Sequence, residues 1–325
     1  MIPDQLITLD DLSRAGAARR AAINVATALG FDETLTGQVA IVATELATNL
    51  ARHAVGGALH IAVVRNELQL VAIDRGPGIL RMSDALRDGH STGGSAGSGL
   101  GAVLRLATSF DIHTLMGVGT TIFAGFERAR TPQRLVVGGT CLPVAGETVC
   151  GDAWVMHERP GRALVALIDG LGHGPGAAEA ARVGVEVFAR HPDLAPAPLI
   201  EAMHLAMRAT RGAAVGVAEL DLGRRVLRFA GVGNIAGTLI ADQGTRSVVS
   251  HGGIVGSECR KVQEFEYPWF AGTLLVLASD GLQTQWKLDR YAGLVLRHPA
   301  LVAATLYRDW ARGRDDSTVV ALREA

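Results

Sequence analysis

Apolar residues follow a helical period near the N-terminus and form shorter, strand-like runs further along the chain. Residues 11–29 mix Ala, Leu and Val with basic residues and stop at Gly30, which predicts a helix closed by a C-terminal glycine. Asp32 is suited to cap a second helix, which we expect to run to about Ala54 and to end at Gly56-Gly57. The rest of the first half predicts a hairpin turn at Asn66-Glu67, a helix near 102–108, and strands at 58–65, 68–74, 109–116 and 119–127.

The second half of the chain is dense in strands. Short apolar runs between Gly and Pro turns predict strands at 135–141, 148–158, 162–169, 213–221, 225–231, 234–241, 261–267, 273–279 and 316–323. Helical spacing predicts helices at 176–190, 196–210 and 298–311. This half favours a two-sheet sandwich with helices outside, whereas the first half favours helices on one face of an antiparallel sheet. The polar stretch Thr131-Pro-Gln-Arg134 separates them, so we predict an α+β chain with domains at 1–130 and 135–325.

Composition narrows the class of protein. Of the 325 residues, 48% are apolar, which excludes a wholly disordered chain. Lys and Arg (31) nearly balance Asp and Glu (32), so there is no basic field for a phosphate backbone and we expect no nucleic-acid partner. No apolar run reaches the ~18 residues of a membrane span and no signal peptide is recognisable, so we expect a soluble, cytoplasmic protein. Three cysteines without a C-x-x-C pair indicate neither a disulfide framework nor a zinc cage.

The second predicted helix carries a polar stripe beside its apolar one. Glu45, Asn49 and Arg52 gather on one side of the helix, with His53 at the edge of the stripe. The apolar stripe, which we expect to face the core, is made of Val39, Ala43, Leu46 and Leu50. A solvated helix face has the same pattern, so the meaning of the polar stripe depends on the segments that follow.

Two later segments have the chemistry of a nucleotide site. Asp74 ends a strand and is followed by Gly76 and Gly78, and a carboxylate there can accept a hydrogen bond from an exocyclic amine while the glycines let a base approach. An ordinary Asp-x-Gly turn is the alternative. The glycine-rich tract 93–101 enters a helix and exposes N–H groups that suit a phosphate chain. It lacks the ending of a P-loop and follows no strand, as a dinucleotide fingerprint requires.

In this order the three segments resemble the boxes of the GHKL (Bergerat) ATP-binding fold, an α/β sandwich of helices on an antiparallel sheet. The resemblance implies that Asn49 binds Mg²⁺, that Glu45 acts as a base or positions the nucleophile, and that Asp74 binds the adenine amine. It implies further contacts with ATP from Arg52, His53, Gly76, Gly78, the lid glycines Gly97, Gly99 and Gly101, and Thr120 and Thr121 after Gly119.

Within that superfamily the chain resembles the RsbT-type switch kinases of stressosome signalling over roughly residues 5–127. The strings that carry the likeness are Glu45-Leu-Ala-Thr-Asn-Leu-Ala-Arg-His-Ala54 and Asp88-Gly-His-Ser-Thr-Gly-Gly94. Where the family lid usually reads Gly-Leu-Gly-Leu, this chain has Ser95-Ala-Gly-Ser98. We find no phosphoacceptor histidine helix and no transducer domain, which argues against a histidine kinase and a gyrase-type ATPase. The resemblance implies ATP-dependent phosphorylation of a Ser or Thr on a STAS-domain protein.

Acidic residues lie at strand ends in the second half. If the hairpin turns at Pro160-Gly161, the register places Asp152 opposite Asp169, and like charges that face each other are destabilising unless a cation lies between them. Asp280 ends a third strand, and Asp315-Asp316 precede a fourth. Oxygen ligands without a His or Cys set favour Mg²⁺ or Mn²⁺, and two such ions can activate a water and clamp a phosphoryl group. Turn aspartates are the alternative for any one of these acids.

These acids resemble the metal site of the PPM phosphatases, specifically their SpoIIE/RsbX branch, over about residues 136–323. The matching strings are Gly-Asp-x-Trp at 151–154, Asp-Gly-Leu-Gly-His-Gly at 169–174, Gly-Val-Gly-Asn ending at Asn234, Ser-Asp-Gly-Leu at 279–282 and Arg-Asp-Asp-Ser-Thr at 314–318. The resemblance implies two Mn²⁺ or Mg²⁺ ions, held by catalytic Asp152, Asp169 and Asp280, the Gly170 carbonyl, and one of Asp315 and Asp316, with Asp315 favoured. His173 is either an acid near the leaving oxygen or a turn histidine.

The two resemblances together predict a bifunctional regulator of sigma-factor partner switching. The first half would phosphorylate a STAS-domain protein, and the second half would hydrolyse phosphoserine or phosphothreonine on such proteins with a metal-activated water. Two alternatives stay open, in which the first half binds ATP without turnover: as a module that docks a sigma factor, a sigma-factor regulator or another effector, or as a sensor for the phosphatase.

Overall fold

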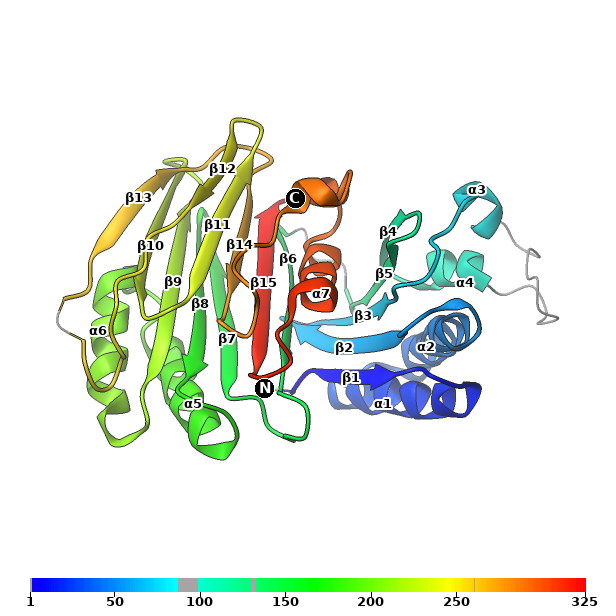
Figure 1. Ribbon diagram of the computed structural model, residues 1–325, viewed down its shortest axis with the longest axis horizontal. Coiled ribbons are helices and arrows are strands. Elements are labelled where there is room, and N and C mark those ends of the chain that lie inside the picture. The colour runs from blue at the N-terminus through cyan, green and yellow to red at the C-terminus, as the bar shows by residue number, and fades with distance from the viewer. Residues whose placement is uncertain (1, 87–98, 130–132, 260) are drawn as a thin grey trace. The chain divides into compact units, whose positions relative to one another are not determined.

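The structure, a computed structural model, describes residues 2–86, 99–129, 133–259 and 261–325 (Figure 1). Its elements form two units, one made of Met1–Gly138 and Lys287–Arg308, the other of Gly139–Trp286 and Asp309–Ala325. The first unit therefore takes in a segment that lies far along the sequence. Among the described residues, no helix is both long and apolar enough to cross a bilayer.

The first unit contains an antiparallel sheet in the strand order β1-β2-β3-β5-β4. The strands are β1 (Gln5–Thr8), β2 (Ala58–Val64), β3 (Glu67–Ile73), β4 (Ser109–Leu115) and β5 (Gly119–Phe126). The helices of residues 2–106 are η1 (Leu12–Arg14), α1 (Ala15–Ala28), α2 (Glu33–His53), α3 (Met82–Ala85) and α4 (Gly99–Leu106). Since α1 and α2 pack on one face of this sheet, the predicted layer of helices on an antiparallel sheet is confirmed.

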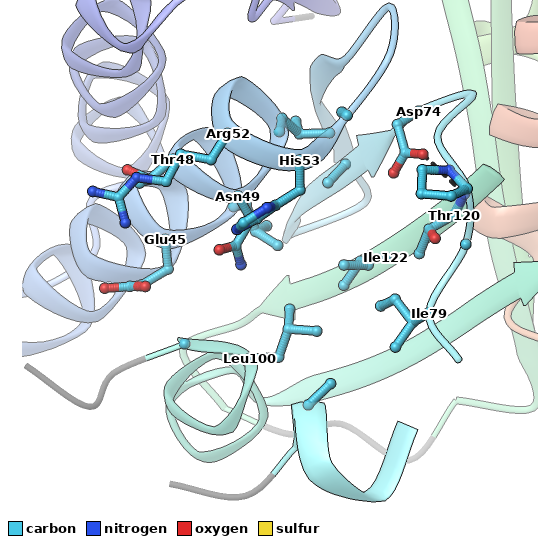
Figure 2. Close-up of a pocket in the computed structure, with 18 of the residues that line it drawn as sticks. Glu45, Thr48, Asn49, Arg52, His53, Asp74, Ile79, Leu100, Thr120 and Ile122 are labelled. Atoms are coloured by element: carbon cyan, nitrogen blue, oxygen red, sulfur yellow. Dashed lines mark hydrogen bonds between the residues drawn. The ribbon is translucent and has the colours of Figure 1, made fainter. Parts of the chain in front are cut away.

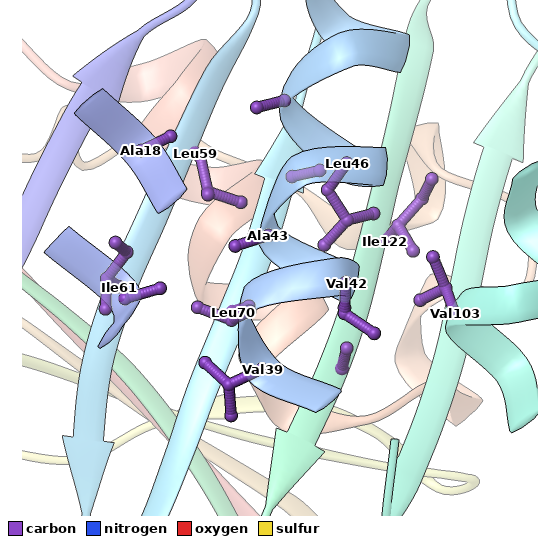
Figure 3. Close-up of a cluster of buried hydrophobic side chains, with 14 of the residues drawn as sticks. Ala18, Val39, Val42, Ala43, Leu46, Leu59, Ile61, Leu70, Val103 and Ile122 are labelled. Atoms are coloured by element: carbon purple, nitrogen blue, oxygen red, sulfur yellow. The ribbon is translucent and has the colours of Figure 1, made fainter. Parts of the chain in front are cut away.

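Local signals explain where α1 and α2 begin and end. Gly30 follows α1 with φ of 65°, a left-handed conformation that glycine adopts without strain. The Asp32 side chain caps α2 by accepting a hydrogen bond from the Leu35 N–H at 2.8 Å. The predicted apolar stripe of α2 is buried and packs on the sheet, as Figure 3 shows for Val39, Ala43 and Leu46.

The β2–β3 hairpin turns one residue earlier than predicted. Val64 pairs with Glu67, so the turn is Arg65-Asn66 and not Asn66-Glu67. Arg65 adopts the left-handed conformation, with φ of 57°. Glu67 belongs to β3 because it pairs with Val64 of β2, and its carboxylate also accepts hydrogen bonds from Gln69 and from Ser109 of β4.

The other face of this sheet is covered by residues 287–308. This segment holds η3 (Leu288–Arg290), η4 (Leu294–Leu296) and most of α7 (Pro299–Trp310). The His298 ring stacks on Phe123 at 3.8 Å between centroids, and the Thr305 hydroxyl lies 3.5 Å from that of Thr121. Neighbouring strand residues point to opposite faces, so Ile122 and Ala124 meet the helical layer while Thr121 and Phe123 meet this segment. Every residue of β5 is buried as a result.

The second unit contains two five-stranded sheets, with the orders β13-β10-β9-β8-β7 and β12-β11-β14-β15-β6. The strands of the first are β7 (Asp152–Arg159), β8 (Arg162–Gly170), β9 (Ala213–Asp221), β10 (Val226–Val232) and β13 (Glu264–Pro268). Those of the second are β6 (Leu135–Leu142), of which only residues 139–142 belong to this unit, β11 (Ala236–Ala241), β12 (Gly244–Ser247), β14 (Leu274–Ala278) and β15 (Ser317–Glu324). Helices α5 (Pro175–Arg190), α6 (Pro196–Ala206) and η2 (Met207–Ala209) pack on the first sheet, where Met203 of α6 is buried in one cluster with Leu164 of β8 and Val215 of β9. The predicted pair of sheets with flanking helices is confirmed.

Candidate functional sites

A cavity of about 800 Å³ opens in the first unit, beside the polar stripe of α2 (Figure 2). Its volume is in the range of small-molecule sites. Glu45 and Asn49 approach it from α2, while Asp74 and Thr120 approach it from the sheet. The sequence-predicted residues that line it are Glu45, Asn49, Arg52, His53, Asp74, Gly78, Gly99 and Thr120. The fold therefore brings together three segments that are separated along the chain.

Four other predicted nucleotide residues do not appear among the lining residues. Gly76 lies behind the lining and donates its N–H to Asp74 Oδ1 at 2.6 Å. Gly101 is buried within α4. Thr121 points to the opposite face of the sheet, toward Thr305, because it follows Thr120 in a strand. Gly97 lies outside the described residues.

Asp74 is fixed from both of its neighbouring segments. Its Oδ1 accepts hydrogen bonds from the Gly76 N–H at 2.6 Å and the Thr120 N–H at 3.3 Å. Among described residues, no hydrogen bond reaches Oδ2, which leaves this oxygen for a ligand donor. Burial raises the pKa of Asp74, and those two N–H groups and the Arg308 guanidinium oppose the rise. A half-buried carboxylate held this way suits recognition of an exocyclic amine.

The turn after Asp74 passes close to β4. Gly78 has φ of 83°, and a Cβ at that position would lie 2.9 Å from the Leu115 carbonyl oxygen. The next residue, Ile79, donates its N–H to the Thr114 hydroxyl at 2.9 Å, and that hydroxyl lies 2.9 Å from the Thr120 hydroxyl. Thr114 therefore organises this wall of the cavity. Sequence analysis did not single it out, because its partners become neighbours only through the pairing of β4 with β5.

In the second unit, Asp152 begins β7 and faces Asp169 on β8. The register that the Pro160-Gly161 turn predicts is confirmed, since Arg159 pairs with Arg162 and Asp152 pairs with Asp169. Asp280 follows β14, and Asp315-Asp316 precede β15. Gly170 ends β8, directly after Asp169, and donates its N–H to the Gly151 carbonyl at 3.2 Å.

The carboxylates of this cluster raise one another's pKa values. Burial raises the pKa of Asp169, and the carboxylates of Asp152, Asp280 and Asp315 raise it further. Burial also raises the pKa of Asp152; the nearby Ser279 and Thr318 hydroxyls oppose this rise, while Asp316 and Asp315 add to it. Like charges gathered in a half-buried place cost free energy until protons or cations neutralise them.

Two of the remaining groups orient this cluster. Both oxygens of Asp316 accept backbone hydrogen bonds, Oδ1 from Val144 and Oδ2 from Gly151, each at 2.7 Å. Asp316 thereby ties residues 144–151 to the start of β15. Asp315 accepts a single hydrogen bond among the described residues, from the Asp316 N–H to its Oδ1 at 2.9 Å, which leaves Asp315 the better placed of the two to bind a metal ion. The Asn234 amide donates to Asp280 Oδ2 at 2.6 Å, a positioning role that sequence analysis did not assign.

The donor set fits hard divalent ions. Asp152 Oδ2 is buried and, among the described residues, has no hydrogen-bond partner, as expected of an oxygen whose natural partner is a cation. As the side chains stand, no three His, Cys, Asp or Glu groups of the described chain are close enough to enclose one ion. Binding would therefore draw the carboxylates together, and it would relieve the repulsion that raises their pKa values.

His173 lies at the rim of this cluster. Its Nδ1 lies 2.9 Å from Glu147 Oε1, and its side chain is 55% exposed, so it is a solvent-facing group held by a carboxylate. Burial raises the pKa of Asp316, and the electrostatic effect of His173 is among those that oppose the rise. The structure places His173 close to the acids, and Glu147 is a partner that lies too far from it in sequence for spacing to predict.

Comparisons with known proteins match the two halves of the chain to two different families. Residues 159–324 match the family described as Stage II sporulation protein E (SpoIIE), and residues 9–125 match the histidine kinase-like ATPase domain. Serine/threonine-protein kinase RsbT of Bacillus subtilis (strain 168) is 37% identical over 112 residues, which are 33% of this chain and 84% of RsbT. Phosphoserine phosphatase RsbX of the same strain is 23% identical over 138 residues, 42% of this chain and 69% of RsbX.

Solved structures give the same picture. The structure titled "The bacterial stressosome: a modular system that has been adapted to control secondary messenger signaling" matches with a TM-score of 0.55 and 27% identity, covering 59% of this chain and all of that chain (100%). A crystal structure of RsbX in complex with magnesium matches with a TM-score of 0.55 and 19% identity, covering 60% of this chain and 98% of that one.

A two-sheet sandwich with acids at its strand ends defines a phosphatase of the PPM type, and the helical layer with its cavity defines a GHKL-type ATPase domain. The chain belongs to the SpoIIE family and carries an RsbT-related ATPase domain in front of its RsbX-related phosphatase domain.

Proposed function

We propose that this chain is a bifunctional regulator of partner switching, with residues 1–130 as an ATP-dependent Ser/Thr kinase domain and 135–325 as a phosphoserine/phosphothreonine phosphatase domain. The observation that carries the proposal is the facing pair of Asp152 and Asp169, whose repulsion and orphaned oxygen call for a cation. The likeness to RsbT, and to a stressosome structure, supports STAS-domain proteins as the substrates of both halves.

In the phosphatase half, Asp152, Asp169, Asp280, Asp315 and the Gly170 carbonyl would hold two Mn²⁺ or Mg²⁺ ions. Bound there, such ions supply an acidified water and neutralise the phosphoryl oxygens. The protein's own part is to fix the carboxylates, through Asn234 on Asp280 and through the backbone donors that occupy Asp316. No Cys or Ser nucleophile stands in a suitable motif, so we expect direct hydrolysis without a phosphoenzyme.

In the kinase half, Asp74 would accept a hydrogen bond from the adenine amine and Asn49 would hold Mg²⁺ on the phosphates of ATP. Glu45 would take the proton from the Ser or Thr hydroxyl of the substrate. The oxygen of that hydroxyl bonds to the γ-phosphorus as the bond between this phosphorus and ADP breaks, and ADP leaves. Glu45 and Asn49 line the cavity from α2, one helical turn apart, so both would face the phosphate chain of a bound nucleotide.

The test incubates the chain with candidate STAS-domain proteins from the same organism and labelled ATP. We expect phosphate transfer by the unaltered chain, and loss of transfer by Glu45→Ala with ATP binding retained. Glu33→Ala, a change at the exposed start of the same helix, is the control and should transfer normally. If Glu45→Ala left every effect on the partner intact, the first half would be a docking module or a sensor.

The phosphatase is tested on the phosphorylated STAS protein with Mn²⁺. Asp169→Asn should abolish phosphate release, and Asp193→Asn, which changes an exposed acid, should not. Release that persists after chelation of all divalent metal would refute the proposed metal chemistry.

A further inference from the structure

Arg308 comes from the part of the sequence that matches the SpoIIE family, yet it lies in the first unit. It sits near the C-terminal end of α7 and is 8% exposed. Its Nη1 donates a hydrogen bond to the main-chain carbonyl oxygen of Asp74 at 2.7 Å. A buried guanidinium is costly unless its donors are used, so this contact is a built feature of the fold.

The backbone around this contact is shaped to admit it. Gly119 has φ of 134°, and a Cβ there would lie 2.1 Å from the Asp74 carbonyl oxygen and 2.7 Å from Arg308 Nη1. Any side chain at this position would therefore push the guanidinium and the carbonyl apart. Glycine at the start of β5 is what allows Arg308 to reach Asp74.

With this contact, the main-chain N–H, the main-chain carbonyl and the side chain of Asp74 all have hydrogen-bond partners. The Asp74 N–H donates to the Thr120 carbonyl at 3.0 Å, its Oδ1 accepts from the Gly76 and Thr120 N–H groups, and its carbonyl accepts from Arg308. The following peptide is held as well, since the Arg75 N–H donates to the Val55 carbonyl at 2.9 Å. The side chain that faces the cavity is thus fixed through its own main chain.

We propose that Arg308 is a positioning residue of the nucleotide site, so that docking of residues 287–308 and binding of an adenine nucleotide stabilise each other. The inference rests on the proposed function, because it takes the cavity to be an adenine nucleotide site and Asp74 to be the group that reads the base. Without the guanidinium the Asp74 peptide can rotate, and the carboxylate then meets the exocyclic amine less often. By reciprocity, a bound nucleotide that holds Asp74 in place also holds Arg308.

The experiment measures ATP and GTP affinity by calorimetry on the full chain. Arg308→Met keeps the apolar stem and removes the donors, and we expect it to weaken ATP binding about tenfold, the scale of one hydrogen bond to a charged group. GTP has a carbonyl oxygen in place of the 6-amine that Asp74 would bind in adenine, so the GTP affinity should hardly change and the preference for ATP should shrink. Arg308→Lys keeps one charged donor and should restore part of the ATP affinity.

Arg297→Met is the matched control. Arg297 lies on the same segment and pairs with Asp111 at 3.2 Å, but its side chain is 48% exposed and it does not contact Asp74. It should bind ATP as the unaltered chain does. An equal loss of ATP affinity in Arg297→Met would mean that docking of the segment as a whole, and not the Arg308 contact, supports ATP binding, which overturns the positioning role of Arg308.

A second measurement needs no variant. In the unaltered chain, saturating ATP should slow hydrogen exchange of the amides in 299–308, and unchanged exchange there overturns the inference. If the unaltered chain binds no adenine nucleotide, the proposed function fails and the inference falls with it. If it binds ATP, and a folded Arg308→Met binds equally well with the same ATP preference, only the inference fails.

Discussion

At the residue scale, Asp152 and Asp169 decide how the metal-free chain behaves. Their pKa values are raised, so the folded state binds protons more readily than the unfolded state does. Stability from these groups is therefore full below the ordinary carboxyl pKa and is lost as the pH rises through the folded values. A divalent ion should remove this dependence, because it replaces the protons as the neutralising charge.

We predict that Asp169→Asn stabilises the metal-free chain at neutral and higher pH. Removing one charge of the facing pair should raise Tm in chelator by a few degrees at about pH 8, the shift that ~1 kcal/mol produces in a chain of this size. At about pH 5 the gain should be smaller, because both carboxyls, whose pKa values are raised to about 7 and about 9, are then largely protonated in the folded chain. Melting curves with and without Mn²⁺ check this, and the Mn²⁺-induced rise in Tm should disappear in the variant.

Asp193→Asn is the control for this prediction. Asp193 pairs with Arg159 at the surface, and exposed pairs contribute little to stability. Its Tm should follow the unaltered chain at both pH values and keep the Mn²⁺ response. A metal-free Tm of Asp169→Asn below that of the unaltered chain at high pH would contradict the repulsion.

The sequence predicts part of this site for a physical reason. One turn, Pro160-Gly161, sets the register of its hairpin, so the facing of Asp152 and Asp169 follows from counting. The use of Asp316 by the Val144 and Gly151 N–H groups does not follow, because loop 144–151 meets β15 only in the folded chain. Contacts between residues of one hairpin can be predicted from sequence spacing, whereas contacts made by tertiary packing cannot.

At the scale of elements, α2 supports the proposed nucleotide site, since it carries Glu45 and Asn49 on one stripe and packs its other stripe on the sheet. Signals for such a helix are local and strong. Short exposed strands give weak signals, which is why β1 and β12 were not predicted: each has four residues, and those of β12 are all exposed. Without an apolar alternation there is no pattern to detect.

We predict that Asp32→Ala lowers the free energy of unfolding by about 1 kcal/mol, because it removes the acceptor of the Leu35 N–H at the start of α2. Chemical denaturation of the full chain, monitored by helical circular dichroism, measures this loss. Glu33→Gln is the neighbouring control, which keeps the cap and should cost only a few tenths of a kcal/mol from the helix dipole. Equal losses in the two variants would contradict a specific capping role for Asp32.

At the scale of the whole molecule, residues 287–308 are the feature that the sequence conceals. A helix at 298–311 was predicted as a flank of the second half, yet it lies mostly in the first unit. The sequence does contain a signal: Leu70-Val-Ala-Ile73 of β3 and Ile122-Phe-Ala124 of β5 are unbroken apolar runs, whereas a sheet covered on one face only would alternate apolar and polar residues. The pattern reports that the second face is covered, but it does not name the covering segment.

We predict that a fragment of residues 1–134 exposes that second face and binds the dye ANS more strongly than the full chain does. Phe123 and its neighbours lose the stacking partner His298 and the rest of 287–308 in such a fragment. The same fragment with Phe123→Ser, which makes the bared face more polar, should bind less dye. Fluorescence titration measures both, and a fragment that binds no more dye than the full chain would show that its sheet does not need the cover.

The final prediction concerns communication along the chain. Helix α7 carries Arg308, which holds Asp74, and seven residues later the chain reaches Asp315 at the proposed metal site. A nucleotide that holds Arg308 in place should also restrict residues 309–316, which would lower the entropy lost when Asp315 binds a metal ion.

We therefore expect a non-hydrolysable ATP analogue to lower the Mn²⁺ concentration for half-maximal phosphatase rate about fivefold, at the lower end of known couplings. Initial rates on p-nitrophenyl phosphate across a Mn²⁺ titration measure this, and Asp74→Asn should abolish the response while its nucleotide-free rate stays normal. Identical Mn²⁺ titrations with and without bound analogue would mean that the two sites work independently.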